Sequence, residues 1–313
     1  MTSESNISAQ GSNEHEEYEN PLPDMSGICN YPPAIAVINA RSLYNKKTSL
    51  CTLINETNLD ICILSETWER NEPNLENLLN LDCFHVISKK RESGNTGGGV
   101  AIIINRSYSV IDPDLKPPIG IEIIWRVVKI SVKKKNFRIA IAAVYVPPRS
   151  KLDEDVQEFL IMSIHYLRSK YDDIKFMIGG DINNLDLSPV LDSYDFLKQL
   201  VEFPTRGNRI LDVLVSCMKL LYYPAFVKPP LECDDGVDGE PSDHKIVFVI
   251  PNQQNVNRAL NSKKEIKFRP LPDSGILEFG RFMTNHKWTE IIENDDIEAK
   301  VEAFHSTIRT KYE

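Results

Sequence analysis

The 313-residue sequence has few cysteines, and they follow no pattern. Its six cysteines include no Cys-X-X-Cys pair, which argues against a disulfide framework and against a zinc site. Long apolar runs are also missing, because none reaches the roughly 18 to 20 residues that span a bilayer. The N-terminus lacks the basic and apolar pattern of a secretion signal. We therefore expect an intracellular protein, nuclear or cytoplasmic, with reduced thiols and no membrane partner.

The sequence lacks an excess of positive charge as well. Its net charge is −9 and its pI is about 5.3, which argues against binding DNA through bulk electrostatics. The charge is uneven, however. Residues 1–30 hold six acidic residues and no Lys or Arg, so residues 31–313 carry only −3, the difference between −9 and −6. A hydrolase with carboxylates in its active site can carry that deficit there and still present a basic rim to phosphate.

Composition divides the chain into three parts. Residues 1–32 are polar, acidic and rich in proline towards their end, which predicts a disordered lead-in. Residues 33–250 alternate between apolar segments and turns, which predicts one folded domain. Residues 251–313 begin with a polar stretch, predicted to be a linker up to Lys264, and continue as a helical connector. We expect this connector to be the start of a downstream region that is absent from this chain.

Within the central part, strands outnumber helices. The predicted strands are Ala34–Ile38, Asp60–Leu64, Phe84–Ser88, Gly99–Ile104, Ile121–Lys133, Phe137–Val146, Lys175–Ile178, Ile210–Val215 and Lys245–Ile250, and the predicted helices are Lys47–Asn55, Asp153–Lys170 and Ser188–Leu200. Ile121–Lys133 is apolar on both alternating faces, which is typical of a strand covered on both sides. The pattern therefore predicts an α/β fold, a four-layer sandwich of two packed mixed β-sheets flanked by helices.

Polar side chains recur where these apolar strands end. They are Asn39, Glu66, Tyr145, Asp181 with Asn183, and Asp243 with His244. Each has a structural alternative; Glu66, for example, could simply pair with Arg70, and Asp181 could belong to a turn. The ends of strands at one rim of a sheet are where α/β proteins place their ligands, and the recurrence of such residues favours a shared site.

The order of these residues and their local sequences resemble a known family. The relevant stretches are Asn39–Leu43, Asp60–Trp68, Gly97–Ile102, Val144–Pro148, Gly180–Asn183, Pro204–Asp212 and Ser242–His244. They resemble the exonuclease–endonuclease–phosphatase superfamily, and more narrowly the endonuclease domain of non-LTR retrotransposons. The segment from Arg269 also resembles the connector that leads to the reverse transcriptase in such elements.

The resemblance implies a role for each residue at the strand ends. Glu66 would be the main Mg²⁺ ligand, with Asn39 beside it and Asp243 near the metal; Mn²⁺ is the alternative cofactor. Asp181 and Asn183 would position and deprotonate the attacking water, Asp212 would hold His244, and Tyr145 would donate a hydrogen bond to the transition state. We assign the base to Asp181, although the sequence leaves His244 open.

Basic residues offer contacts to a DNA backbone. In the family an Arg often follows the motif tyrosine, where this chain has Val146, and Arg149 lies close enough in sequence to substitute. Arg206 and Arg209 lie in the loop leading to Asp212, and Arg41 follows the first motif. Lys46, Lys47, Lys89, Lys90 and Arg91 could also contact the backbone, but most of these basic residues are interpreted as ordinary surface charges. The acidic stretch Glu232–Glu240 is interpreted as a solvated loop, since its spacing does not fit a calcium loop.

The function implied by the resemblance is a Mg²⁺-dependent DNA endonuclease that leaves 3′-hydroxyl and 5′-phosphate ends. Its partner would be DNA, and the reverse transcriptase region that follows in such elements is absent from this chain. Two alternatives stay open. The same fold could act on abasic DNA or on other phosphate esters, or the chain could be a non-catalytic, transposon-derived binding module.

Overall fold

The computed structural model describes residues 32–92, 97–132, 135–261 and 273–312. The chain divides into two compact units, Met1–Asn261 and Ser262–Glu313. The predicted lead-in falls almost entirely outside the described residues. The first unit holds two six-stranded sheets, and its architecture positions every predicted site residue.

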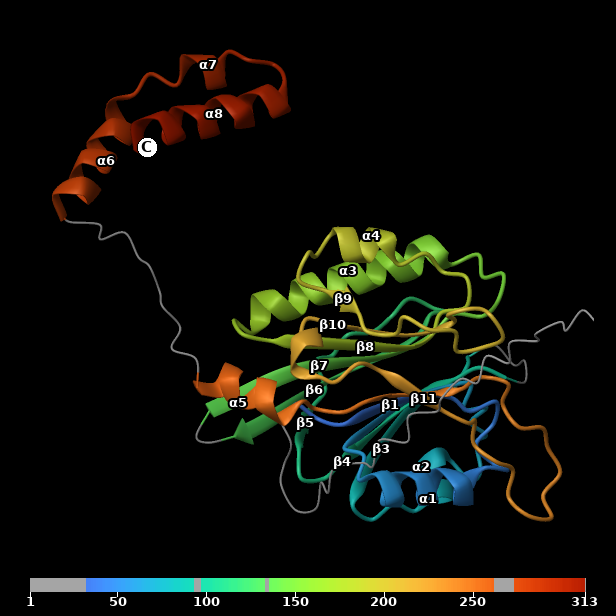
Figure 1. The fold of residues 1–313 in the computed structure, drawn as a ribbon. Helices are drawn as coiled ribbons and strands as arrows, with labels where there is room; N and C mark the ends of the chain where they lie inside the picture. The colour runs from blue at the N-terminus through green and yellow to red at the C-terminus, as the bar shows by residue number, and fades with distance from the viewer. Residues whose placement is uncertain (1–31, 93–96, 133–134, 262–272, 313) are drawn as a thin grey trace, which may run out of the picture. The chain divides into compact units, whose positions relative to one another are not determined.

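The first sheet has the strand order β11-β12-β1-β2-β4-β3. Its strands are β1 (Ile35–Asn39), β2 (Ile61–Ser65), β3 (Phe84–Lys89), β4 (Val100–Asn105), β11 (Phe226–Lys228) and β12 (Ile246–Val249). β1 and β2 run parallel, and the remaining neighbours are antiparallel. Helices α1 (Lys47–Thr57) and α2 (Leu75–Leu79) cover the outer face of this sheet (Figure 1).

The second sheet has the strand order β5-β6-β7-β8-β10-β9. Its strands are β5 (Ser109–Ile111), β6 (Glu122–Val132), β7 (Lys135–Tyr145), β8 (Lys175–Asp181), β9 (Lys198–Gln199) and β10 (Asp212–Ser216). β7 and β8 are parallel, and the other pairs are antiparallel. Helices α3 (Asp153–Lys170) and α4 (Ser188–Asp192) cover its outer face (Figure 1).

Three apolar layers result from the alternation of side chains along the strands. In β1, Ile35 and Val37 face the other sheet, whereas Ala36 and Ile38 face the helices. β6 is likewise buried on both faces, with Ile124 and Val128 between the sheets and Trp125 under α3. The predicted fold, a four-layer sandwich of two mixed sheets between helices, is confirmed.

One predicted helix is much shorter in the structure. Ser188–Leu200 was expected to be helical throughout, but α4 ends at Asp192 and Lys198–Gln199 form β9. β9 pairs with Val215 and Ser216 of β10, so the ladder supplies the backbone hydrogen bonds that a longer helix would have made. Tertiary pairing therefore overrides the helical pattern of the sequence.

A second difference concerns the predicted linker. Within Pro251–Lys264, residues Gln253–Asn261 form helix α5. Val256 is only 3% exposed and packs into the apolar layer between the sheets. Five of the nine residues of α5 are Asn or Gln, which explains why the sequence reads as a polar linker. We therefore extend the proposed catalytic domain from residue 250 to Asn261.

The second unit is helical, with α6 (Asp273–Asn285), α7 (Thr289–Ile292) and α8 (Ile297–Tyr312). The ring centroids of Trp288 and Phe304 lie 5.6 Å apart, and Trp288 Nε1 donates to the Met283 carbonyl over 3.2 Å. The predicted connector thus contains three helices within residues 273–312, and its relation to a downstream region stays a prediction. None of the described helices is long and apolar enough to cross a membrane.

Candidate active site

The topology brings the polar strand ends to one edge of both sheets. In the first sheet, Asn39 at the end of β1 is in register with Ser65, and Glu66 follows. In the second sheet, Asp181 is in register with Tyr145 on one side and with Asp212 on the other. β12 is antiparallel to β1, so His244, just before β12, reaches the same edge.

Gly180 makes the close approach of β7 and β8 feasible at this edge. Its φ is +139°, and a Cβ atom there would overlap the Val144 carbonyl group. Only glycine adopts this backbone without a steric cost. Tyr145 and Asp181, the next residue of each strand, are therefore held side by side.

Asn39 joins the two sheets through its side-chain amide. Its Nδ2 donates to Glu66 Oε1 over 3.2 Å and to Asp181 Oδ2 over 2.8 Å. Its Oδ1 accepts a hydrogen bond from the backbone N–H of Arg41 over 3.1 Å. Since the amide donors face two carboxylates and the acceptor faces a donor, both ends of this buried side chain are satisfied.

Asp212 and His244 form a buried dyad. His244 Nδ1 lies 2.8 Å from Asp212 Oδ2, and the backbone N–H groups of His244 and Asp212 donate to the hydroxyls of Ser242 and Thr205. Burial lowers the pKa of His244, but the hydrogen bond and charge of Asp212, with the charge of Asp181, outweigh it and raise the pKa above its ordinary value. The carboxylate thus fixes the ring with Nε2 left for the site, 4.0 Å from Asp181 Oδ2.

Asp181 lies at the centre of the cluster and is fully buried. Burial and the neighbouring charge of Asp212 raise its pKa to about 7, although His244 and hydrogen bonds from Asn183 and Asn39 lower it. The Asn183 N–H donates to Asp181 Oδ1 over 2.9 Å, and its side-chain amide donates to the Val146 carbonyl over 2.8 Å. A carboxyl group that changes charge near neutral pH is suited to accept and release a proton.

Tyr145 is held as a hydrogen-bond donor. It is 6% exposed, and burial together with the charges of Glu66 and Asp181 raises its pKa, so the hydroxyl keeps its proton. The Arg91 guanidinium lies 5.6 Å from the ring centroid of Tyr145, and its Nε donates to Glu122 Oε1 over 2.7 Å. Glu122 is the cross-strand partner of Tyr145.

Arg91 therefore lies beside the candidate site, and it is not an ordinary surface charge, the interpretation that the sequence favours for most of the basic residues. Glu122 is buried, and an acidic residue at the start of an otherwise apolar strand was the available sign of a buried ion pair. The sequence does not say which cation pairs with it.

Two of the four predicted DNA-binding arginines border the catalytic residues. A pocket of about 210 Å³ is lined by Asn39, Arg41, Glu66, Arg206, Asp243 and His244. Arg206 forms an ion pair with Asp243 over 2.6 Å, and Arg41 pairs with Glu240. Burial raises the pKa of Asp243, but the hydrogen bond and charge of Arg206 outweigh it and leave the pKa below its ordinary value.

The other two arginines lie outside this pocket. Arg209 is exposed; it pairs with Arg206 through a backbone bridge and donates to Asn184 Oδ1. Arg149 is exposed in the turn that follows β7, and it does not line the 210 Å³ pocket. The suggested replacement of the missing motif arginine by Arg149 stays a prediction, whereas Arg91 is the arginine found beside Tyr145.

The donor set fits a hard divalent cation. Among the described residues, ligand atoms of Asp181, Asp212 and His244 lie within 4.8 Å of one another, but the 2.8 Å contact between Asp212 and His244 is a hydrogen bond and occupies both atoms. Glu66 accepts hydrogen bonds from Asn39 and Trp68 over 3.2 and 3.3 Å, longer than a usual charge-assisted bond of about 2.8 Å. The side-chain oxygens of Glu66, Asn39 and Asp243 line the pocket, and such hard oxygens suit a divalent metal.

Comparisons with known proteins match both the sequence and the fold. The model of the Endonuclease/Exonuclease/phosphatase family matches residues 36–208, which is more than half of the chain and ends just before Asp212. No curated protein matches the sequence.

Solved structures share the fold. Truncated TDP2 of Caenorhabditis elegans has a TM-score of 0.52 and 14% identity, covering 69% of this chain and 96% of that one. An endonuclease/exonuclease/phosphatase from Bacteroides vulgatus has a TM-score of 0.51 and 17% identity, covering 70% and 99%. The endonuclease domain of TRAS1, a telomere-specific non-LTR retrotransposon, has a TM-score of 0.49 and 15% identity, covering 70% and 98%.

Proposed function

Because the chain belongs to the Endonuclease/Exonuclease/phosphatase family of metal-dependent hydrolases, we propose that it is a Mg²⁺-dependent DNA endonuclease. It hydrolyses one phosphodiester bond to leave 3′-hydroxyl and 5′-phosphate ends, as in the nicking of target DNA by non-LTR retrotransposons. Mn²⁺ is the alternative metal. The observation that carries the proposal is the buried Asp212–His244 dyad, which points its free nitrogen towards Asp181 and a pocket lined by two arginines.

The chemistry requires positive charge at the phosphate, because a phosphodiester anion repels hydroxide. Glu66 and Asn39, with Asp243 nearby, would hold the cation, whose charge neutralises the phosphate and stabilises the leaving oxygen when it is bound. On the protein side, His244 Nε2 and the Tyr145 hydroxyl would donate hydrogen bonds to the phosphate oxygens.

Asp181 would take the proton from the attacking water, and Asn183 would help to orient that water. The water oxygen bonds to phosphorus while the bond from phosphorus to the 3′ oxygen breaks, which leaves the stated ends. A raised pKa makes Asp181 a stronger base than an ordinary carboxylate, and the raised pKa of His244 favours its proton-donating form. Asp181 is therefore the proposed general base, and His244 is the proposed hydrogen-bond donor to the phosphate.

The decisive experiment is conversion of supercoiled plasmid to open circles, with Mg²⁺ and with EDTA. Parallel assays on abasic duplex, RNA and inositol phosphates separate the proposal from a nuclease or phosphatase with another substrate. Nicking should require the metal, and end mapping should give 3′-hydroxyl and 5′-phosphate. Metal-independent nicking would refute the proposal, and the absence of any hydrolysis would favour a non-catalytic binding module.

Glu66→Gln tests the metal site. The substitution removes a ligand charge but leaves the phosphate contacts, so the Mg²⁺ concentration for half-maximal nicking should rise about tenfold or more while the DNA Kd changes less. Glu56→Gln makes the same chemical change on the exposed side of α1 and should leave both values unchanged. A normal Mg²⁺ titration for Glu66→Gln would remove Glu66 from the metal site.

A further inference from the structure

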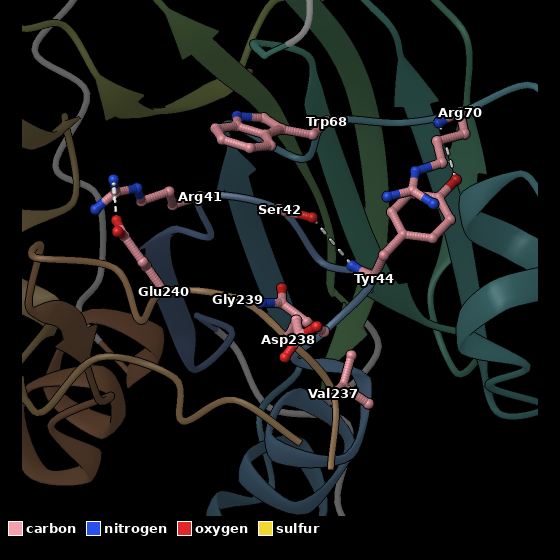
Figure 2. A pocket seen from close by; sticks show the side chains of 10 residues that line it. Arg41, Ser42, Tyr44, Trp68, Arg70, Val237, Asp238, Gly239 and Glu240 are labelled. Atoms are coloured by element: carbon pink, nitrogen blue, oxygen red, sulfur yellow. Dashed lines mark hydrogen bonds and ion pairs between the residues drawn. The ribbon is translucent and has the colours of Figure 1, made fainter. Parts of the chain in front are cut away.

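A second, larger pocket lies next to the catalytic one. It has a volume of about 460 Å³, which lies within the range of roughly 300–1,000 Å³ that is usual for ligand sites. Figure 2 shows Trp68 above it, the loop 237–240 below it, and Arg41 and Arg70 on opposite sides. Arg41 lines both pockets, so whatever enters this Trp68 pocket lies beside the catalytic residues.

Trp68 presents its ring in a fixed orientation. Its indole Nε1 donates to Glu66 Oε2 over 3.3 Å, and its backbone N–H donates to the Gly98 carbonyl over 2.9 Å. The residue is 37% exposed and has a φ of +52°, a conformation that costs a non-glycine residue free energy. A large aromatic ring is thus held open to solvent at the edge of the active site.

The wall around Arg70 is rigid too. The Tyr44 hydroxyl donates to the Pro73 carbonyl over 2.5 Å and accepts from the Arg70 N–H over 2.9 Å. The Arg70 guanidinium is stacked 4.4 Å from the centroid of the Tyr44 ring. On the other side, Arg41 is paired with Glu240 (Figure 2). The two arginines therefore stand on either side of the pocket, and Arg70 is held in place by its stack on Tyr44.

We propose that the Trp68 pocket receives the nucleotide next to the cleaved phosphodiester. The base stacks on Trp68, and its backbone phosphates follow Arg41 and Arg70. Aromatic rings stack with any base, and arginine forks bind phosphate oxygens, so the pocket matches a nucleotide on both counts. This assignment rests on the proposed DNA nuclease function.

The lower wall adds a preference among bases. Asp238 and Glu240 line the pocket. An ionised carboxylate can accept hydrogen bonds but cannot donate them, so these side chains repel phosphate and accept hydrogen bonds from amino groups. Adenine, cytosine and guanine carry an exocyclic amino group, whereas thymine has none. The pocket therefore favours those three bases over thymine at the flanking position.

The experiment is a double-mutant cycle that combines the substitution of one side chain with the removal of one base. A duplex with a mapped nick site is compared with the same duplex lacking the base on the 5′ or the 3′ side of the cleaved bond. With wild type, one of these abasic analogues should be nicked about 5- to 100-fold more slowly, the range that stacking of one base represents. Trp68→Ala should slow nicking of the intact duplex by a similar factor. On the abasic duplex that wild type nicks slowly, Trp68→Ala should reduce the nicking rate little further.

Two variants separate the ring from its hydrogen bond to Glu66. Trp68→Phe keeps an aromatic ring but loses the indole N–H, so it should retain most of the nicking rate. Tyr223→Ala removes an aromatic residue that is 47% exposed and lines neither pocket, and it should behave as wild type.

The outcomes are distinct. If losses from Trp68→Ala and base removal multiply, the base does not lie on Trp68 and the inference is overturned. If wild type nicks thymine-flanked sites as fast as the others, the role of the acidic wall is refuted without any variant. Failure of wild type to nick any duplex would refute the proposed function and this inference together.

Discussion

The carboxyl group of Asp181 lies where its ionised form is disfavoured, and this creates a measurable conflict between stability and activity. Its pKa rises from an ordinary value of 3.8 to about 7, through burial and the charge of Asp212. At about 1.4 kcal/mol per pKa unit, the ionised form costs the folded protein roughly 4 kcal/mol above pH 7. Asp181→Asn should therefore stabilise the metal-free protein while abolishing nicking.

The size of the gain follows from the contacts. Both carboxylate oxygens of Asp181 accept a hydrogen bond, from Asn39 Nδ2 and from the Asn183 backbone N–H. In Asp181→Asn the amide oxygen keeps one of these hydrogen bonds, but the new N–H₂ group faces the other donor, so the second hydrogen bond is lost. Losing one such hydrogen bond costs about 1 kcal/mol, which leaves a net gain of roughly 2–3 kcal/mol at pH 8. Nicking should fall by about 10²-fold or more, as expected for removal of a general base.

The sign of the pH dependence is specific. A carboxyl group with a raised folded-state pKa is protonated in the folded protein below about pH 7 and ionised in the unfolded chain above about pH 4. Its contribution to stability is therefore complete below pH 4 and is lost as the pH rises through 7. At pH 4 the lost hydrogen bond should leave Asp181→Asn about 1 kcal/mol less stable than wild type, and its advantage should appear as the pH rises and level off above about pH 7.

Urea unfolding in EDTA between pH 4 and pH 8 measures this difference. Asp195→Asn, the same change at an exposed position, is the matched control and should show no such trend. A variant that is less stable than wild type at every pH, or by a constant amount, would show that the Asp181 pKa is not raised.

Two further predictions concern the groups around Asp181. His244→Ala should slow nicking by about 10²–10⁴-fold, and Asp212→Ala should slow it by less. The double variant should be no slower than His244→Ala, because the two residues act as one unit. Equal melting temperatures with multiplicative losses of nicking rate would contradict the dyad. Arg91→Gln should lower kcat several-fold with little change in KM, and this loss should vanish in a Tyr145→Phe background if Arg91 acts through the tyrosine. Nicking kinetics of the single and double variants test both predictions. If Arg91→Gln lowers kcat as much in the Tyr145→Phe background as in wild type, Arg91 has a role separate from the tyrosine.

The strands of the sandwich were predictable because a strand that is buried on both faces has an apolar sequence. β1 and β6 carry apolar residues at consecutive positions, since each strand faces the other sheet on one side and helices on the other. Helix α5 is harder to predict, because five of its nine residues are Asn or Gln and the segment therefore resembles a polar linker. β9 depends on pairing with β10, a contact that local sequence does not encode.

In the site, Asn39, Asp181, Asp212 and His244 were predictable because each is tied to a short motif beside an apolar strand. The place of Arg91 depends instead on packing between distant segments. Its guanidinium passes over Gly98, where a Cβ atom would overlap it, and reaches Glu122 of the other sheet. No local pattern encodes such a path, whereas the proposed substitute Arg149 was chosen only for its nearness in sequence.

The arrangement of ion pairs explains how an acidic protein can accept a phosphate chain. The Asp212–His244 pair is buried and the Arg91–Glu122 pair is partly buried, and both hold the geometry of the site. The pairs of Arg206 with Asp243 and of Arg41 with Glu240 are exposed, and exposed ion pairs contribute little free energy, about 0–1 kcal/mol.

Exposed pairs of this kind exchange partners at little cost. A substrate phosphate can replace Asp243 at Arg206 and Glu240 at Arg41, and the released Asp243 carboxylate is then free to approach a bound cation. Under the proposed function, the acidic residues next to these arginines would occupy the phosphate positions in the free protein. The shortage of positive charge in the sequence is therefore compatible with DNA binding, because the site needs a few well-placed arginines rather than a basic surface.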